Sequence, residues 1–150
     1  MTIRPYTPKD KSAILNLLAL NTPDYFDPSE QKDLIHYLDQ EIEDYFVIEE
    51  FNEIIGSGGI NYFPSERLAR IAWDFVNPSQ QGKGVGSLLT KHRLTHLNSN
   101  SEIDTIIVRT SQLVYKFYEK MNFNLNTVTP DYWAPGYDLY EMEQANSNFK

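Results

Sequence analysis

Three glycines alternate within the short polar stretch Gln81–Gly86, and this spacing could bind phosphate. Glycine lets the backbone enter conformations that are closed to other residues, and it leaves room for a ligand. If a helix begins here, successive N–H groups face one concavity at the positive end of the helix dipole, where anions bind. The alternative interpretation is a plain glycine-rich turn.

Two familiar phosphate-binding patterns do not fit this stretch. A P-loop requires Ser or Thr directly after its lysine, but Gly84 follows Lys83. The dinucleotide fingerprint requires Gly-x-Gly-x-x-Gly, whereas these glycines are spaced two apart, ending at Gly86. An enzyme acting on nucleotide phosphates is therefore disfavoured.

Two segments resemble the GNAT superfamily of N-acetyltransferases. Gln81–Gly86 matches the acyl-CoA signature Gln/Arg-x-x-Gly-x-Gly/Ala, and Phe117–Phe123 is similar to the family's Phe-Tyr-x-x-x-Gly-Phe segment. Asn122 stands where the family usually has glycine. Because Asn also tolerates a left-handed helix cap, this change is compatible with the fold. The resemblance covers nearly the whole chain.

The resemblance implies acetyl-CoA as co-substrate and a set of residues that bind it. The strand end before the signature, with Phe75 and Val76, would hydrogen-bond the pantetheine arm through its backbone. Ser111, shortly after the next strand, would contact the cofactor as well. The pyrophosphate would be held by the signature residues Gln81, Gly82, Lys83, Gly84, Val85 and Gly86, with Ser87 beside them.

The resemblance also suggests catalytic residues for attack of an amine on a thioester. Tyr118 would be the general acid that protonates the leaving thiolate, although an aromatic residue on a helix can also be core packing. Some family members place a glutamate base in the strand where this chain has Ile106 and Ile107. Asp74 is the nearest substitute for this base. Alternatively, the Asp74 carboxylate is hydrogen-bonded and only orders the site, or it is simply solvated.

Hydrophobic periodicity and turn residues predict the elements that position these residues. They indicate an α/β or α+β domain with one mixed sheet. The resemblance specifies a mostly antiparallel central sheet of six to seven strands flanked by about four helices, in a single domain over residues 1–150. The polar residues from about Gln144 predict a frayed tail. The predicted helices are those opening at Pro8 and near Pro28, about Gly84–Leu97, and Gln112–Met121; the predicted strands are Thr2–Pro5, Tyr45–Ile48, Ile54–Tyr62, Arg67–Val76, Ile103–Val108, Phe123–Val128 and Tyr137–Met142.

Composition and charge exclude several classes of function. The 150 residues contain no cysteine and carry a net charge of −8, which argues against disulfides, Cys-ligated zinc and general nucleic-acid binding. The sequence has no apolar stretch that would predict a membrane span. We expect a cytoplasmic protein that is a monomer or a homodimer. His92 and His96 are four apart on a predicted helix but lack an obvious third ligand, so no metal site is predicted.

The predicted partner is an amine acceptor, either a small molecule or a peptide. In the family, the region between the first two helices commonly borders the acceptor site, and here it contains Asp24 and Asp27. Asp131 precedes the aromatic pair Tyr132 and Trp133, which could line the same pocket or be a packed loop. Carboxylates and aromatic faces both attract an ammonium group, which favours a cationic acceptor. A non-catalytic acyl-CoA-binding or regulatory module is the alternative function.

Overall fold

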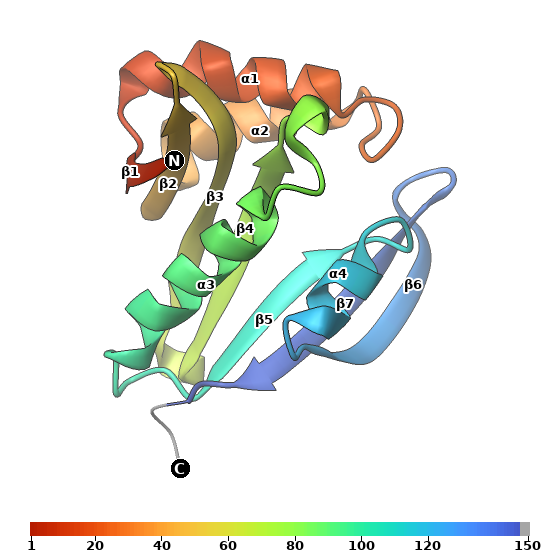
Figure 1. Cartoon of the computed structure of the whole chain (residues 1–150). Coiled ribbons are helices and arrows are strands. Elements are labelled where there is room, and N and C mark those ends of the chain that lie inside the picture. The colour runs from red at the N-terminus through yellow and green to blue at the C-terminus, as the bar shows by residue number, and fades with distance from the viewer. Residues whose placement is uncertain (148–150) are drawn as a thin grey trace. The chain divides into compact units, whose positions relative to one another are not determined.

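A computed structural model describes residues 1–147, which form seven strands and four α-helices (Figure 1). The strands make one mixed sheet in the order β1-β2-β3-β4-β5-β7-β6. β4 and β5 pair in parallel, whereas β1–β2, β5–β7 and β6–β7 pair antiparallel. The predicted fold class is confirmed. The elements are β1 Thr2–Pro5, α1 Lys11–Leu20, α2 Glu30–His36, β2 Asp44–Glu50, β3 Glu53–Phe63, β4 Leu68–Val76, α3 Val85–Asn98, β5 Thr105–Thr110, α4 Tyr115–Lys120, β6 Asn124–Ala134 and β7 Tyr137–Ala145.

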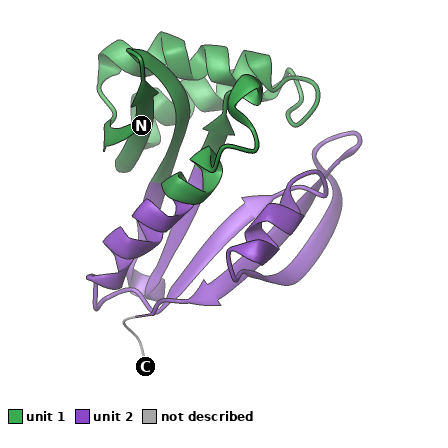
Figure 2. Cartoon of the chain, viewed as in Figure 1, with its two compact units in different colours: residues 1–59, 73–89 green, residues 60–72, 90–150 purple. Residues whose placement is uncertain are grey.

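The chain divides into two compact units (Figure 2). The first unit comprises residues 1–59 and 73–89, and the second comprises residues 60–72 with the chain from Thr90 onward. No helix among the described residues is both long and apolar enough to cross a membrane.

The core of the first unit lies between helices α1 and α2 and the strands β2 and β4. The apolar residues of α1 follow the i, i+3, i+4 spacing that places them on one helix face, and α2 and the π-helical turn after it (η2, Tyr37–Glu41) add a second apolar face. These faces pack on the strands because burial of apolar surface is the main favourable term in folding. The cluster consists of Ile14, Leu17, Leu18, Leu34, Tyr37, Leu38, Tyr45, Val47 and Phe75.

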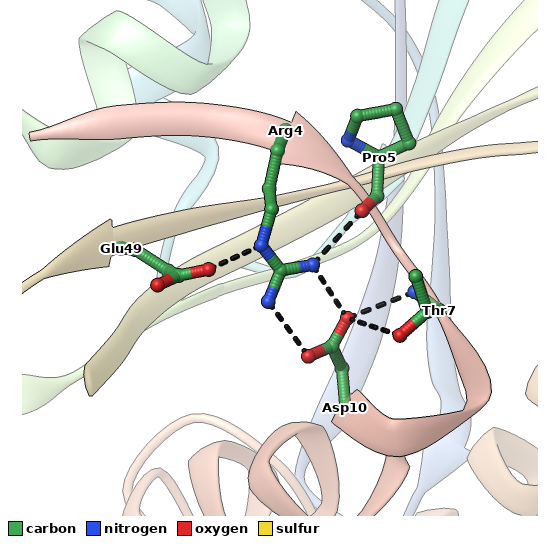
Figure 3. Close-up of polar contacts among 5 residues, drawn as sticks. All are labelled: Arg4, Pro5, Thr7, Asp10 and Glu49. Carbon is green, nitrogen blue, oxygen red and sulfur yellow. Dashed lines mark hydrogen bonds and ion pairs between the residues drawn. The ribbon is translucent and has the colours of Figure 1, made fainter. Parts of the chain in front are cut away.

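Arg4 on β1 connects that strand to the start of α1 and to β2 (Figure 3). Its guanidinium donates to both carboxylate oxygens of Asp10 at 2.8 Å and also contacts the carboxylate of Glu49. Asp10 in turn accepts the backbone N–H of Thr7 at 2.8 Å. The guanidinium beside it holds the pKa of the buried Asp10 carboxyl below its usual value, because hydrogen bonds to the charged form favour ionisation.

Strand β7, in the second unit, ends at Ala145 and is thus longer than the predicted strand Tyr137–Met142. Residues Gln144 and Ala145 still pair with β5, and the buried side chain of Asn146 donates to the carbonyls of Leu97 (2.8 Å) and Ile103 (3.0 Å). Residues 144–146 are therefore not frayed as the sequence predicts, because strand pairing and the Asn146 side-chain hydrogen bonds hold them. Residues 148–150 of the predicted tail lie outside the described residues.

Two other elements of the second unit differ in length from their predictions. Helix α4 begins only at Tyr115, because the residues before it form a turn in which the Ser111 carbonyl accepts two backbone N–H groups. Strand β6 continues to Ala134, beyond the predicted strand end near Val128. Its hairpin partner β7 extends the pairing, with register shifts, and Pro130 is tolerated because β6 is an edge strand.

Candidate active site

The end of β4 contains a backbone conformation that is unusual for a bulky residue. Trp73 has φ +53°, in the left-handed region, and its carbonyl accepts the Tyr45 hydroxyl at 2.8 Å. Phe75 is 1% exposed and its side chain belongs to the core. Asp74 and Val76 alternate with Phe75 along the strand and are half-buried, so their side chains lie on the opposite face.

The predicted phosphate-binding turn leads directly into α3. Gly82 and Gly84 both have φ +81°, and a Cβ atom at either position would meet no heavy atom within 4 Å. The first hydrogen bond of the helix runs from the Leu88 N–H to the Gly84 carbonyl at 2.9 Å. The amides of Val85–Ser87 therefore have no acceptor within the helix. Such a helix start can bind an anion through backbone N–H groups.

The Val85 side chain packs the start of α3 against strand β3. Val85 is 1% exposed, and a Cβ atom on Gly56 would lie 2.9 Å from its Cγ1 atom and 3.3 Å from the carbonyl oxygen of Phe75. The absence of a side chain at Gly56 thus lets the helix start approach both β3 and the end of β4. Our sequence analysis did not identify Gly56, because nothing local distinguishes it from the other glycines of this strand.

Side chains around the turn are mostly exposed, including those of Gln81 and Lys83. Lys83 can add a positive charge beside the helix start, where it would attract phosphate. The side-chain oxygen of Gln80, just before the turn, is buried and has no hydrogen-bond partner among residues 1–147. A buried acceptor of this kind is costly to leave unpaired, so a donor from a ligand or water would be favourable here.

Tyr118 lies in the second unit, in the last turn of α4. The residue is 4% exposed, and its ring makes edge-on contacts with Phe117 (centroids 5.0 Å apart) and Phe123 (5.8 Å). Its carbonyl accepts the N–H of Phe123 at 3.0 Å, while the N–H of Asn122 donates to Glu119 at 3.1 Å. This pattern is a Schellman motif.

Asn122 is the left-handed residue of that motif, with φ +71°. The prediction that asparagine can replace the family's glycine at this helix cap is therefore confirmed. Ring packing accounts for the burial of Tyr118, and its role as general acid stays a prediction.

Ser111 is also in the second unit, between β5 and α4. It is 7% exposed, and its hydroxyl oxygen accepts the backbone N–H of Leu113 at 3.2 Å. Its carbonyl accepts the N–H groups of Val114 and Tyr115. Ser111 thus organises the turn that begins α4, and its contact with a cofactor stays a prediction.

The first unit brings the strand end Asp74–Val76 and the turn Gln81–Ser87 together, and the second unit contains Ser111 and Tyr118. Ile106, in the strand stretch where some family members have a glutamate base, is an apolar core residue. Within the described part of the chain, no group of three or more His, Cys, Asp or Glu residues could hold a metal ion.

Asp27 and Asp131, two of the three aspartates predicted to attract a cationic acceptor, have partners within the chain. Asp27 accepts the N–H of Ser29 at 2.9 Å. Hydrogen bonds from the side chain and the backbone of Ser29 lower the pKa of the Asp27 carboxyl. Asp131 accepts the N–H of Gly136 at 2.7 Å within the β6–β7 hairpin. Asp24 is exposed. The first two therefore organise a helix start and a turn.

The aromatic pair on β6 already contacts a cation. The guanidinium carbon of Arg109 lies 5.0 Å from the ring centroid of Tyr132 and 5.7 Å from that of Trp133. Arg109 also donates to the Tyr132 hydroxyl at 2.8 Å, and the Trp133 indole N–H donates to the Thr110 carbonyl at 3.1 Å. These contacts of Tyr132 and Trp133 thus hold the β6–β7 hairpin against β5.

Glu30, at the start of α2, is a titratable group that our sequence analysis left without a role. Its side chain is buried and accepts the backbone N–H of Asp27 at 3.1 Å. Burial, opposed by this hydrogen bond, raises the pKa of Glu30 to about 7. The spacing of Asp27 and Glu30, three residues apart at the start of α2, is the pattern of a capping box.

The family model of the acetyltransferase (GNAT) family matches residues 12–123. The ribosomal-protein-S18-alanine N-acetyltransferase of Escherichia coli superimposes with a TM-score of 0.80 at 16% identity, covering 97% of this chain and 93% of that one. An aminoglycoside 6′-N-acetyltransferase complexed with coenzyme A gives 0.76 at 17% identity, with 97% of both chains covered.

An N-acetyltransferase from Staphylococcus aureus Mu50 superimposes with a TM-score of 0.74 at 21% identity, covering 96% of this chain and 97% of that one. At these identities the structural similarity shows the fold alone. No curated protein matches the chain in sequence.

Proposed function

Since the chain belongs to the acetyltransferase (GNAT) family, whose members use acetyl-CoA, we propose that it acetylates a primary amine of a small molecule or peptide. In this proposal the amine attacks acetyl-CoA directly within a ternary complex. No acetyl group is carried by the protein in between, and the chain contains no cysteine that could carry one as a thioester.

The observation that carries this proposal is the start of α3. The amides of Val85–Ser87 have no acceptor within the helix, and the left-handed glycines before them leave open space over the turn. An acyl-CoA pyrophosphate supplies the anion that such a site favours, and Lys83 adds a positive charge. The backbone at Phe75 and Val76 would hold the pantetheine arm, and Ser111 stays a predicted cofactor contact.

The reaction requires three events, each of which has a candidate group in this chain. The amine nitrogen bonds to the thioester carbonyl carbon, which becomes an oxyanion that a backbone N–H can stabilise. The carbon–sulfur bond then breaks, and the electron pair leaves on sulfur. Tyr118 would donate its phenolic proton to that thiolate. The amine loses a proton to Asp74 or to a water chain, so that a neutral amide and a free thiol result.

Asp27 and Asp131 keep their negative charges while they accept hydrogen bonds within the chain. Attraction of a cationic amine would rest on these charges, on the exposed Asp24 and on the net charge of −8. A small or peptide amine remains our proposal for the acceptor. The cytoplasmic location and the monomeric or homodimeric state also stay predictions.

The decisive experiment is a thiol-release assay with acetyl-CoA and a panel of amines. The cysteine-free chain adds no thiol background to this assay. We expect amine-dependent release of CoA, together with an increase in melting temperature on addition of CoA but not of ATP. Binding of CoA without turnover on any amine would favour the non-catalytic acyl-CoA-binding module. Absence of CoA binding would contradict both functions.

A further inference from the structure

The left-handed conformation of Trp73 requires support from outside its own strand. A bulky residue in this region is strained, and such residues persist only where the surrounding structure over-determines them. Trp73 is followed at once by Asp74–Val76, the strand end that we propose for binding of the pantetheine arm. The groups that hold Trp73 therefore also set the direction of this strand end.

Tyr45 supplies the first support, from β2. Its ring lies so close to β3 that a Cβ atom on Gly59 would be 2.5 Å from the Tyr45 Cδ1 atom. Its hydroxyl lies 2.8 Å from the carbonyl oxygen of Trp73 and 3.1 Å from the hydroxyl of Ser57. A carbonyl can only accept, so the Tyr45 O–H donates to Trp73, and the fully buried Ser57 donates to the Tyr45 oxygen. One phenol thus connects three strands.

Asn21 supplies the second support, at the other end of the segment. Its side-chain amide donates to the carbonyls of Val76 at 3.1 Å and of Leu17 at 2.8 Å. Asn21 is only 4% exposed, so its amide is fixed by burial. Between the two supports, the Phe75 ring lies with its centroid 5.1 Å from that of Phe26.

We propose that Tyr45 and Asn21 are positioning residues that hold the segment Trp73–Val76 in its ligand-binding conformation before acyl-CoA arrives. This proposal rests on the function proposed above. Both side chains bind the segment's own carbonyls, at its first and last residue, and neither is required to touch the substrate. The segment then meets the pantetheine arm without reorganising, which avoids the loss of affinity that a partly populated binding conformation causes.

The test uses two ligands that share the same phosphates. CoA contains the pantetheine arm, whereas 3′-phosphoadenosine 5′-diphosphate contains only the nucleotide and the pyrophosphate. Tyr45→Phe removes the hydroxyl and keeps the ring. If this variant populates the binding conformation about one-tenth of the time, calorimetry will show about tenfold weaker CoA binding with unchanged binding of the nucleotide fragment.

Tyr6→Phe is the matched control, because the Tyr6 ring packs edge-on against Tyr45 at 5.7 Å but makes no hydrogen bond to the segment. It should leave both affinities unchanged. Asn21→Ala is an independent variant at the other end of the segment, and it should reproduce the selective loss for CoA. Melting curves establish that each variant is folded, and Asn21→Ala carries the test if Tyr45→Phe does not fold.

Each remaining outcome contradicts the proposal in a distinct way. An affinity for CoA within twofold of the parent in both folded variants would show that the segment keeps its conformation without these side chains. An equal loss for both ligands would show a general structural effect rather than positioning of the pantetheine segment. Failure of the parent protein to bind either ligand would overturn the proposed function itself, and the positioning role with it.

Discussion

Two stretches of backbone close together in the sequence, the strand end Trp73–Val76 and the turn Gln81–Gly86, both contain left-handed residues but are held in opposite ways. At the strand end, Tyr45 and Asn21 bind the first and last carbonyls, and the residue with positive φ is a tryptophan. At the turn, the residues with positive φ are glycines with no heavy atom within 4 Å of a would-be Cβ.

This difference separates a surface that is complete before binding from one that a ligand completes. A left-handed conformation costs about 1–2 kcal/mol for a residue with a side chain, and hydrogen bonds and packing must offset that cost at Trp73. Glycine has almost no such cost, so Gly82 and Gly84 need no support from neighbouring side chains. The turn can therefore keep its amides open for phosphate. Four substitutions would break or sharpen this comparison.

The largest effect is expected on kcat, from substitution of Tyr118, which lies in neither stretch. If the two stretches only bind acyl-CoA, chemistry must come from another residue, and Tyr118→Phe should lower kcat about a hundredfold while the affinity for CoA is unchanged. Steady-state kinetics and calorimetry measure the two quantities. Tyr115→Phe is the control, since Tyr115 is on the same helix and its ring packs at a tilt against Tyr140, with centroids 4.7 Å apart. Turnover of Tyr118→Phe at the parental rate would show that Tyr118 only packs.

Substitution within the open turn should weaken binding. Gly84→Val introduces a β-branched residue at φ +81° and a side chain in the space over the amides, so we expect about tenfold or greater loss of CoA affinity. Gly136→Val is a matched control, because Gly136 has φ +86° and equally open surroundings in the β6–β7 turn. Equal affinities of the folded Gly84→Val variant and the parent by calorimetry would contradict the assignment of the turn.

Substitution of Gly56, where the start of α3 packs on β3, should weaken CoA binding less, because it acts through a small displacement. Gly56→Ala places a methyl group 2.9 Å from the Val85 Cγ1 atom and 3.3 Å from the Phe75 carbonyl oxygen, so the Val85 side chain or the helix start must move. We expect about threefold weaker CoA binding and a lower melting temperature, since overpacking is destabilising. A melting temperature that falls while CoA affinity stays unchanged would show that the turn tolerates movement of its helix.

The smallest effect on ligand binding is expected at Glu30, the first residue of α2, whose carboxyl accepts the Asp27 N–H from the loop that begins at Asn21. The Glu30 carboxyl has a pKa of about 7 in the folded protein, above the value of about 4.3 expected when unfolded. Its contribution to stability is therefore full below about pH 4 and is lost as pH rises through 7. Glu30→Gln keeps an acceptor for the Asp27 N–H and removes this loss. Relative to the parent, its free energy of unfolding should rise between pH 5 and pH 8 in urea titrations; parallel pH profiles would refute the assignment.

The parts of the site that could be predicted from the sequence depend on neighbouring residues. Alternating glycines before an amphipathic helix predict the open turn, and Asn122 after the last turn of α4 predicts its left-handed cap, because φ preferences act within a few residues. The order of strands and helices follows from hydrophobic periodicity for the same reason.

Only the tertiary structure determined how the strand end is held. Nothing in the sequence around Trp73 indicates a left-handed residue, because its support comes from Tyr45, 28 positions away, and Asn21 reaches the carbonyl of Val76 across 55 positions. The raised pKa of Glu30 likewise depends on burial, which adjacent residues do not encode. Local preferences are properties of short segments, whereas these hydrogen bonds and this desolvation exist only once the sheet and helices have packed together.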